Sequence, residues 1–577
     1  MPTLEWIGKD KVVNHHLEVP YRVLEEQYTY NAEKSKNMII RGDNLEALKA
    51  LLPRYEGRVK CIYIDPPYNT GNEGWVYNDN VNDPRIKKWL GEVVGKEGED
   101  LSRHDKWLCM MYPRLKLLQR LLAEDGVIFI SIDDTEYANL KLICDEIFGA
   151  NCFVSNISWQ RTYSTRNDSK GIVNEVEHLL AYSKQPDWNP NKLPRTEEMN
   201  SKYKNPDNDR TLWRTDNAFA PGAATHQGMV YAIQHPFTGK MLYPANGRCW
   251  TFGQDQMLEI MRGWCDYELR DLNDAHERAV VCGVADEDVR QGVQAIVLSE
   301  SLEISAKKAQ AVYERGQWPR FFFTKGGKGG IARKTYLENV GGKLPTNFWP
   351  FSETGHTDEA KKEMLAIFDG KATFETPKPR RLLEFVLRIA GDEDTLVLDS
   401  FAGSGTTAHA VLNMNKADGG NRKFILVEMM DYAESITAER VKRVIDGYGS
   451  GKQAVEGTGG DFTFYDLGPI LLLPNGNLNE EVGAEKIREY VYFMETKSSI
   501  EPGKEDEPYY MGIHLDSAYY FYYERDRLTT LGRDFLGSIK TKAGRYTIYA
   551  DQCTLSPTEL ERWHITFKKI PRDISKL

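Results

Sequence analysis

The sequence predicts an α/β protein in which two blocks of alternating strands and helices flank a long polar insert. Within the first 160 residues, short apolar, β-branched runs alternate with segments of helical periodicity, a pattern typical of a parallel sheet. From about Tyr163 to Phe351 the chain is polar and rich in Asn, Pro, Gly and Trp, which predicts a loop-rich inserted domain. The alternating pattern returns at Pro379. From about Pro469 onward, Tyr-rich strand-like segments such as "YYFYYERD" predict a small α+β domain.

The individual elements follow from periodicity and from the residues that end each run. In the first block we expect strands at residues 37–43, 59–64, 127–133 and 153–159, and helices at 44–52, 106–122 and 135–149. In the insert we expect one helical stretch, between Glu287 and Arg315. In the second block we expect a helix at 379–390, strands at 395–401 and 423–429 that are each followed by a helix, and a Gly-rich linker at 449–460. The expected domains are 1–162, the first half of one sheet; 163–351, the insert; 352–468, the second half of the sheet; and 469–577, the C-terminal domain.

The composition is that of a globular protein, with 41% hydrophobic and 28% charged residues. A chain of 577 residues is too long for one core, so several domains are expected. Its net charge of −11 gives no sign of nucleic-acid binding, so any such surface must be regional. No apolar run approaches the roughly 20 residues that cross a bilayer, and the N-terminus lacks the apolar segment of a signal peptide. The eight cysteines are scattered without a CxxC pair, which favours reduced thiols in the cytoplasm over disulfides or a metal site.

The second block carries a glycine-rich turn within "LDSFAGSGTTAHAV", Leu398 to Val411. The turn joins a predicted strand to a predicted helix. There Gly403 and Gly405 allow a close backbone approach, and the helix N-terminus offers free N–H groups to a ligand. The third glycine of the dinucleotide fingerprint is missing and no GK[ST] follows, so neither common phosphate-loop pattern fits. Glu428, at the end of the next strand, suits the two hydroxyls of a ribose. The second block therefore predicts a nucleoside site without a pyrophosphate.

In the first block, the second strand ends in "DPPY", Asp65 to Tyr68. Because proline cannot donate to a sheet, the strand must stop at Ile64. The carboxylate of Asp65 and the carbonyl of Pro66 can accept both hydrogens of an aromatic amine such as that of adenine, whose lone pair is otherwise delocalised into its ring. The two prolines fix the direction of that carbonyl before a substrate arrives. Tyr68 offers a face on which an extruded base can stack.

The insert contains a Gly- and Lys-rich stretch, "TKGGKGGIARKT", from Thr324 to Thr335. Its Lys-Thr pair follows an arginine rather than a glycine, and "RFFF" precedes it instead of a buried strand, so we expect a mobile basic loop. Between Arg320 and Lys343 there are six Lys or Arg against one acid. A basic stretch beside Trp and Tyr side chains suits a nucleic-acid backbone with nearby bases, although a solvated loop explains it equally well.

"DPPYNTG" together with "FAGSGTT" resembles the amino-methyltransferases that act on adenine in DNA with S-adenosylmethionine. The order of DPPY half, insert and FAGSGTT half is similar to the β group of these enzymes. That resemblance implies an α/β fold with a Rossmann-like methyltransferase sheet, circularly permuted, and an inserted target-recognition domain. The Asn69-Thr70-Gly71 continuation, the long insert and the small α+β C-terminal domain most resemble modification subunits of type III restriction systems.

The resemblance also implies roles for individual residues. Asp65, Pro66 and Tyr68 would hold the target base, and Pro67 would rigidify the turn. The following would wrap the methionine part of the cofactor: Phe401, Ala402, Gly403, Ser404, Gly405 and Thr406. Asp399 would lie at the strand end, and Glu428 would bind the ribose. Asp43 in "RGDN" resembles the acid near the cofactor adenine, and Lys378 and Pro379 in "ETPKP" resemble the element beside the cofactor carboxylate.

We therefore expect an S-adenosylmethionine-dependent, adenine-N6 DNA methyltransferase that binds duplex DNA, flips an adenine and methylates it by direct in-line attack without a metal. Aspartate rather than serine at position 65 favours adenine N6 over cytosine N4. The resemblance implies a homodimer, and any helicase or nuclease of a restriction system would be a separate partner subunit. Two alternatives stay open. The same fold could methylate cytosine N4, RNA or a protein glutamine amide, or the chain could be a non-catalytic DNA-binding subunit, against which the intact motifs argue.

Overall fold

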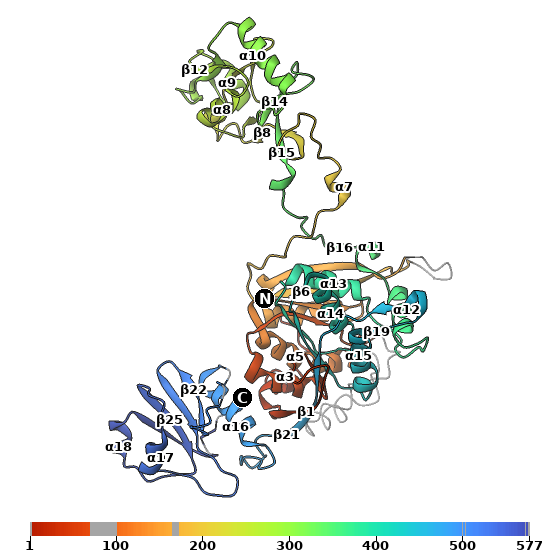
Figure 1. Cartoon of the computed structure of the whole chain (residues 1–577), viewed down its shortest axis with the longest axis vertical. Coiled ribbons are helices and arrows are strands. Elements are labelled where there is room, and N and C mark those ends of the chain that lie inside the picture. The colour runs from red at the N-terminus through yellow and green to blue at the C-terminus, as the bar shows by residue number, and fades with distance from the viewer. Residues whose placement is uncertain are drawn as a thin grey trace. The chain divides into compact units, whose positions relative to one another are not determined.

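The computed structural model describes residues 3–69, 101–163, 172–498, 500–501, 503–571 and 573–574 (Figure 1). The chain forms two compact units, one of Met1–Asn191 with Pro345–Leu577 and one of Lys192–Leu344. Within the described ranges, no helix is long and apolar enough to span a membrane. Over the same ranges, no three or more His, Cys, Asp or Glu side chains are grouped to hold a metal ion.

The first unit is built on a large sheet whose six central strands run parallel. Outside them, β1 pairs antiparallel with β21, and β6 pairs antiparallel with both β4 and β5. In spatial order the strands are β1 (Arg22–Tyr30), β21 (Phe462–Ile470), β2 (Met38–Arg41), β18 (Lys423–Glu428), β17 (Leu396–Asp399), β3 (Val59–Ile64), β4 (Leu122–Ile132), β6 (Val176–Ser183), β5 (Phe153–Gln160) and β16 (Phe348–Trp349). The expected parallel α/β sheet is confirmed.

The two sequence blocks interleave in this sheet. Strands β17 and β18, from the second block, lie between β2 and β3 of the first. Strand β17 pairs with β3 through Val397 with Cys61 and Leu398 with Ile62. The strand order runs outward in opposite directions from this pair, so β17 and β3 form a topological switch point. In open α/β sheets, ligands bind outside the carboxyl ends of the strands at such a point.

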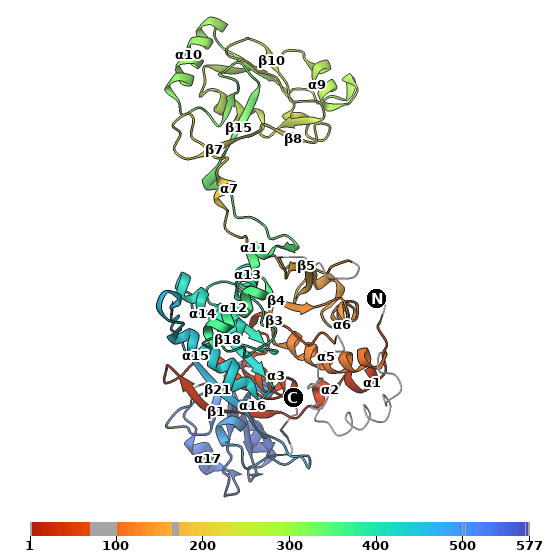
Figure 2. The ribbon, with the colours of Figure 1, turned by 90° about the vertical axis from the view of Figure 1, so that its right-hand side faces the viewer.

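Helices cover both faces of the parallel strands (Figure 2). On one face Ile62 and Ile64 share a core with helices α3 (Asn44–Tyr55), α5 (Leu101–Leu121) and α6 (Tyr137–Phe148). On the other face Phe129 packs on Trp349, which packs on Phe385 of α13 (Arg380–Ala390). The same side carries α14 (Thr406–Asp418) and α15 (Glu439–Asp446). Burial on both faces explains why these strands read as continuous apolar runs.

The insert has a core of its own rather than the expected loops around one helical stretch. Buried tryptophans Trp213, Trp250 and Trp264 lie at its centre. Its strands range from two to six residues, too short to show alternation in the sequence. The helices are α7 (Glu197–Asn200), α8 (Gln254–Met261), α9 (Ala275–Cys282) and α10 (Leu302–Arg315). The strands are β7 (Trp213–Asn217), β8 (Phe219–Pro221), β9 (Ile233–Gln234), β10 (Met241–Leu242), β11 (Arg248–Trp250), β12 (Tyr267–Arg270), β13 (Ala295–Leu298), β14 (Phe321–Phe323) and β15 (Ile331–Tyr336).

The compact insert spans residues 192–344 and so is shorter than the expected 163–351. Strand β6 belongs to the large sheet, although it lies within the range expected for the insert. Residues next to the two ends of the insert pair with each other. Leu193 N donates to Lys343 O at 2.8 Å, and Lys343 N donates to Leu193 O at 2.9 Å. Gly342 permits this approach, since a Cβ there would lie 2.3 Å from the Leu193 oxygen.

The C-terminal region forms a small mixed sheet with helices, as the expected α+β domain requires. Its strands, in spatial order, are β22 (Tyr510–His514), β23 (Ser517–Phe521), β25 (Arg545–Ala550) and β27 (Ile565–Lys569). Helix α16 (Ala484–Thr496) packs on one side of it, and α17 (Arg533–Ser538) and α18 (Pro557–Arg562) on the other. The tyrosines of "YYFYYERD" lie in these two cores and at their edges, which makes them packing residues.

Candidate active site

A cavity of about 450 Å³ opens at the carboxyl ends of β3 and β17. Both sequence motifs line it, although more than 300 residues separate them. The predicted site residues in its lining are Asp65, Pro66, Pro67, Tyr68, Lys378, Asp399, Phe401, Ala402, Gly403, Ser404, Thr406 and Glu428. A volume of this size suits a nucleotide-sized ligand. The structure thus brings the two predicted half-sites together.

Three predicted residues lie outside this lining. Asp43 caps α3 by accepting from Leu45 N at 2.9 Å, and its other oxygen pairs with Arg114 at 3.2 Å. Pro379 is the residue before α13, and Gly405, with φ of 80°, is the residue before α14. These three positions shape the elements around the cavity, and a direct cofactor contact for any of them stays a prediction.

The DPPY turn is held from behind by helix α5. The indole of Trp107, which is fully buried, donates to the carbonyl of Pro67 at 2.7 Å. Asn69 follows with φ of 63°, a left-handed conformation that asparagine tolerates, and its amide donates to the buried Glu136. Thr70 and Gly71, which complete the quoted motif, lie outside the described residues. The turn is thus fixed by contacts remote from the cavity.

Asp65 and Tyr68 belong to a network of charged groups on the cavity wall. Asp65 Oδ1 accepts from the Tyr68 hydroxyl and from Lys378 Nζ, both at 2.8 Å. Glu177 on β6 also faces Lys378 Nζ, at 3.0 Å, and lies within hydrogen-bond reach of the Tyr68 hydroxyl, whose single hydrogen can go to either carboxylate. Burial and then the charges of Asp65 and Glu177 raise the pKa of Tyr68 well above its ordinary value, so its hydroxyl stays protonated. Burial acts to lower the pKa of Lys378, but the two carboxylates outweigh burial and raise it.

The glycine turn and Glu428 form the other wall. Gly403 has φ of 52°, and its N–H donates to Glu428 Oε2 at 2.8 Å. The second oxygen of Glu428 accepts from Met430 N at 3.0 Å. Burial raises the pKa of Glu428 to about 7, although these hydrogen bonds oppose the shift. Burial likewise raises the pKa of Asp399 to about 7, against hydrogen bonds from Thr407 and from Phe401 N.

The lining also contains residues that the sequence motifs did not identify. Phe374 and Tyr432 meet edge to face at 5.7 Å beside Glu428 and offer apolar surface to a flat ring. Trp159 and Glu177 lie on the DPPY side. Glu177 stands one residue into an apolar run, "VEHLLAYS", and this run is the signal that would have identified β6 and placed Glu177 near the site.

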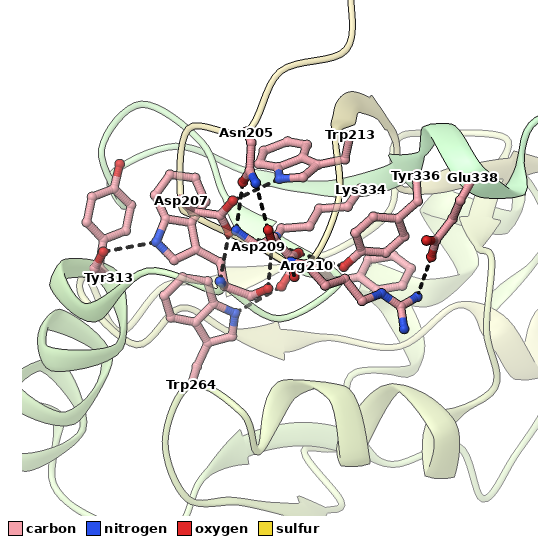
Figure 3. Close-up of polar contacts among 12 residues, drawn as sticks. Asn205, Asp207, Asp209, Arg210, Trp213, Trp264, Tyr313, Lys334, Tyr336 and Glu338 are labelled. Atoms are coloured by element: carbon pink, nitrogen blue, oxygen red, sulfur yellow. Dashed lines mark hydrogen bonds and ion pairs between the residues drawn. The ribbon is translucent and has the colours of Figure 1, made fainter.

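Part of the basic stretch of the insert is neutralised inside its own fold (Figure 3). Lys334 is fully buried, and its ammonium lies 2.5 Å from Asp207 and 2.6 Å from Asp209. Trp318 stacks on Tyr313, with ring centroids 4.6 Å apart. Lys334 is therefore a core residue and is not available to a phosphate backbone.

The expectation that no buried strand precedes the Gly-Lys stretch is wrong. Phe321–Phe323 form β14, which is buried throughout and pairs antiparallel with β15. Residues 324–330 are the turn between these strands, closed by Thr324 N donating to Gly330 O at 3.0 Å. Lys325 and Lys328 are exposed on this turn. Three consecutive phenylalanines lack the polar alternation by which a half-buried strand is recognised.

The interleaved sheet, with a glycine-rich turn and a carboxylate–tyrosine turn on one cavity, defines a Rossmann-like methyltransferase fold. The chain belongs to the DNA methylase family, whose family model (N6_N4_Mtase) matches residues 59–439 and so includes both motifs.

Named relatives agree with this family. The chain is 33% identical to the Mod subunit of the type III restriction-modification enzyme StyLTI of Salmonella typhimurium, over 73% of this chain and 57% of that protein. It is 28% identical to the EcoPI Mod subunit of Escherichia phage P1, over 74% of this chain and 63% of that protein. It is 29% identical to the type II methyltransferase M.KpnI of Klebsiella pneumoniae, over 70% of this chain and 85% of that protein. The match thus spans less than two thirds of either Mod subunit.

Proposed function

We propose that this chain is a site-specific DNA methyltransferase that transfers a methyl group from S-adenosylmethionine to N6 of adenine in duplex DNA. One observation carries the proposal: Asp65 and Tyr68 line the same cavity as Gly403 and Glu428. The turn proposed to bind the amine and the turn proposed to bind the nucleoside therefore follow neighbouring strands of one sheet.

The cofactor side fits a nucleoside with a charged amino-acid tail. Glu428 presents a carboxylate to ribose hydroxyls, and Phe374 and Tyr432 offer apolar surface to a purine. Gly403 adopts a left-handed conformation and lets Phe374 approach the turn closely, since a Cβ there would lie 3.2 Å from the Phe374 ring. When bound, S-adenosylmethionine supplies a methyl group already activated on a sulfonium sulfur. No nucleophilic side chain is needed for such a transfer.

On the substrate side, Asp65 acts on the amine. Its carboxylate accepts an amine hydrogen, which localises the nitrogen lone pair, and takes up the proton that the amine loses on methylation. The Tyr68 ring provides a stacking face for a flipped base. Because Trp107 fixes the Pro67 carbonyl, the turn is preorganised before the base enters.

DNA as the substrate is supported by the family and by the names of the relatives. We place target recognition in the insert, residues 192–344 by its compact core. Two relatives are Mod subunits of type III systems, so we propose that the chain modifies DNA for such a system as a homodimer in the cytoplasm, with restriction carried by a separate partner subunit. M.KpnI, a type II methyltransferase, supports the alternative of an enzyme without that partner.

Methylation-sensitive sequencing of a genome that expresses this chain tests the proposal. We expect N6-methyladenine at one recurrent sequence, and no modification with Asp65→Ala. Nucleoside analysis of the modified DNA separates the two target bases, because a cytosine-N4 enzyme would give methylated cytosine instead of N6-methyladenine. An unmodified genome, together with purified wild-type protein that leaves duplex DNA unlabelled with labelled cofactor, would refute the proposal.

A further inference from the structure

The ammonium of Lys378 contacts two carboxylates of the cavity wall. Its Nζ lies 2.8 Å from Asp65 Oδ1 and 3.0 Å from Glu177 Oε1, and it donates to the Tyr68 hydroxyl at 2.6 Å. All the groups are largely withdrawn from water, with side-chain exposures of 12% for Lys378, 24% for Asp65 and 6% for Glu177. An ammonium has three hydrogens, so all three contacts can be made at once.

Other ionisable groups face this set from the surrounding elements. Arg161, just after β5, lies 3.7 Å from the far oxygen of Glu177. Tyr63 on β3 shares a hydrogen bond with Ser131 at 2.9 Å, and Asp399 lies at the end of β17 on the same cavity. Asp65 and Glu177 with Lys378 and Arg161 contribute two negative and two positive charges, and Asp399 adds a further carboxyl group beside them. Removing Lys378 would leave two neighbouring carboxylates with one more distant cation.

We propose that Lys378 and Glu177 are positioning residues for the target amine. Lys378 holds the Asp65 carboxylate in place by direct contact, and Glu177 supplies a second acceptor on which the ammonium remains when the amine binds Asp65. Without Glu177, the ammonium is held by Asp65 and Tyr68 alone, so it competes with an incoming amine for the oxygens of Asp65. The inference rests on the proposed function and gives the side chain of Lys378 to the substrate side, whereas the sequence resemblance placed it beside the cofactor.

The inference predicts opposite effects for the two single variants. In Lys378→Met, adjacent like charges raise the pKa of the carboxylate pair, so the acid limb of the pH–rate profile moves up by about one to three pH units. In Glu177→Gln, the acid limb does not move up, but KM for DNA rises because Lys378 competes for Asp65. In the double variant Asp65 has no charged neighbour at either position, so its acid limb returns close to that of the wild type, a non-additive result.

The test is single-turnover methylation of duplex DNA by the full chain at saturating cofactor across a pH series, for the four proteins of this cycle. Lys141→Met is the matched control, because Lys141 forms a similarly buried pair with Asp145 at 2.7 Å on α6, away from the cavity lining. Calorimetry with S-adenosylmethionine should give similar affinities for all variants. An acid limb of Lys378→Met that coincides with that of wild type, or a double variant equal to the sum of the singles, would overturn the inference.

Thermal unfolding across the same pH range provides a readout without activity. A carboxylate pair with a raised folded-state pKa binds more protons when folded, so Lys378→Met should lose stability relative to wild type as pH rises, and the double variant should recover it. If the variants show these differences in pH-dependent stability but the wild type methylates no DNA, the proposed function fails, while the interaction of Lys378 with the two carboxylates is still supported. If the four proteins melt with parallel pH dependence, the inference itself fails.

Discussion

Replacing Asp65 by asparagine removes the carboxylate proposed to receive the amine while keeping its shape. Asp65 accepts two hydrogen bonds at 2.8 Å, one from a cation, and its side chain is 24% exposed. Removing one preorganised polar group from an enclosed site costs about 10²–10³ in rate, or about 2.7–4 kcal/mol. Because partial exposure screens the charge, we expect the lower end of that range, about a hundredfold loss in the rate of methyl transfer.

Single-turnover transfer of labelled methyl groups to a duplex carrying the target sequence measures this loss. Cofactor affinity by calorimetry should be unchanged, since Glu428 and the glycine turn lie on other strands. Asp187→Asn, which removes an exposed carboxylate outside the cavity lining, serves as the control. The reasoning is refuted if Asp65→Asn transfers methyl groups as fast as Asp187→Asn, or if it loses cofactor binding in proportion to its rate.

Three further predictions concern the supporting residues. Ribose hydroxyls donate to an ionised carboxylate, so cofactor affinity should rise as pH rises through about 7, the raised pKa of Glu428. Glu428→Gln should abolish this pH dependence and weaken cofactor binding by about tenfold or more. Calorimetry at several pH values tests this, and an equal dependence of cofactor affinity on pH in Glu428→Gln and in wild type would contradict it. Trp107→Phe removes the donor to Pro67 O, so kcat should fall while KM for the cofactor is unchanged; a normal kcat argues against preorganisation. Lys334→Met leaves the buried Asp207 without its cation, so residues 192–344 should lose about 3–5 kcal/mol of local stability by hydrogen exchange, and unchanged protection would count against this.

The sequence predicted those parts of the protein that are set by local pattern. Strands with continuous apolar runs, such as "VKCIYI" before Asp65, were recognisable because both faces are buried. The short motifs that contain Asp65 and Gly403 were recognisable because their residue types suit a defined chemical role. What brings them together is the insertion of β17 and β18 between β2 and β3, which follows from the resemblance and from no single segment.

Features set by tertiary packing were not predictable in this way. The ammonium of Lys378 contacts Glu177 in addition to Asp65 because β6 joins the sheet, and the sequence placed β6 in the insert. Likewise Lys334 counts as a basic loop residue in the sequence. In the structure it is buried, and it pairs with acids more than 120 positions away along the chain. Side chains whose partners lie far along the chain carry no local signature.

The pairing of Leu193 with Lys343 has an evolutionary consequence. Because the two ends of the insert already lie side by side, the chain between them can be exchanged for another of different length without opening the large sheet. Joining ends that are already close adds little loop-closure entropy, and that entropy grows only slowly with length. Recombination at these two points could give one catalytic scaffold a new sequence preference in a single event, while every residue that lines the cavity is inherited unchanged.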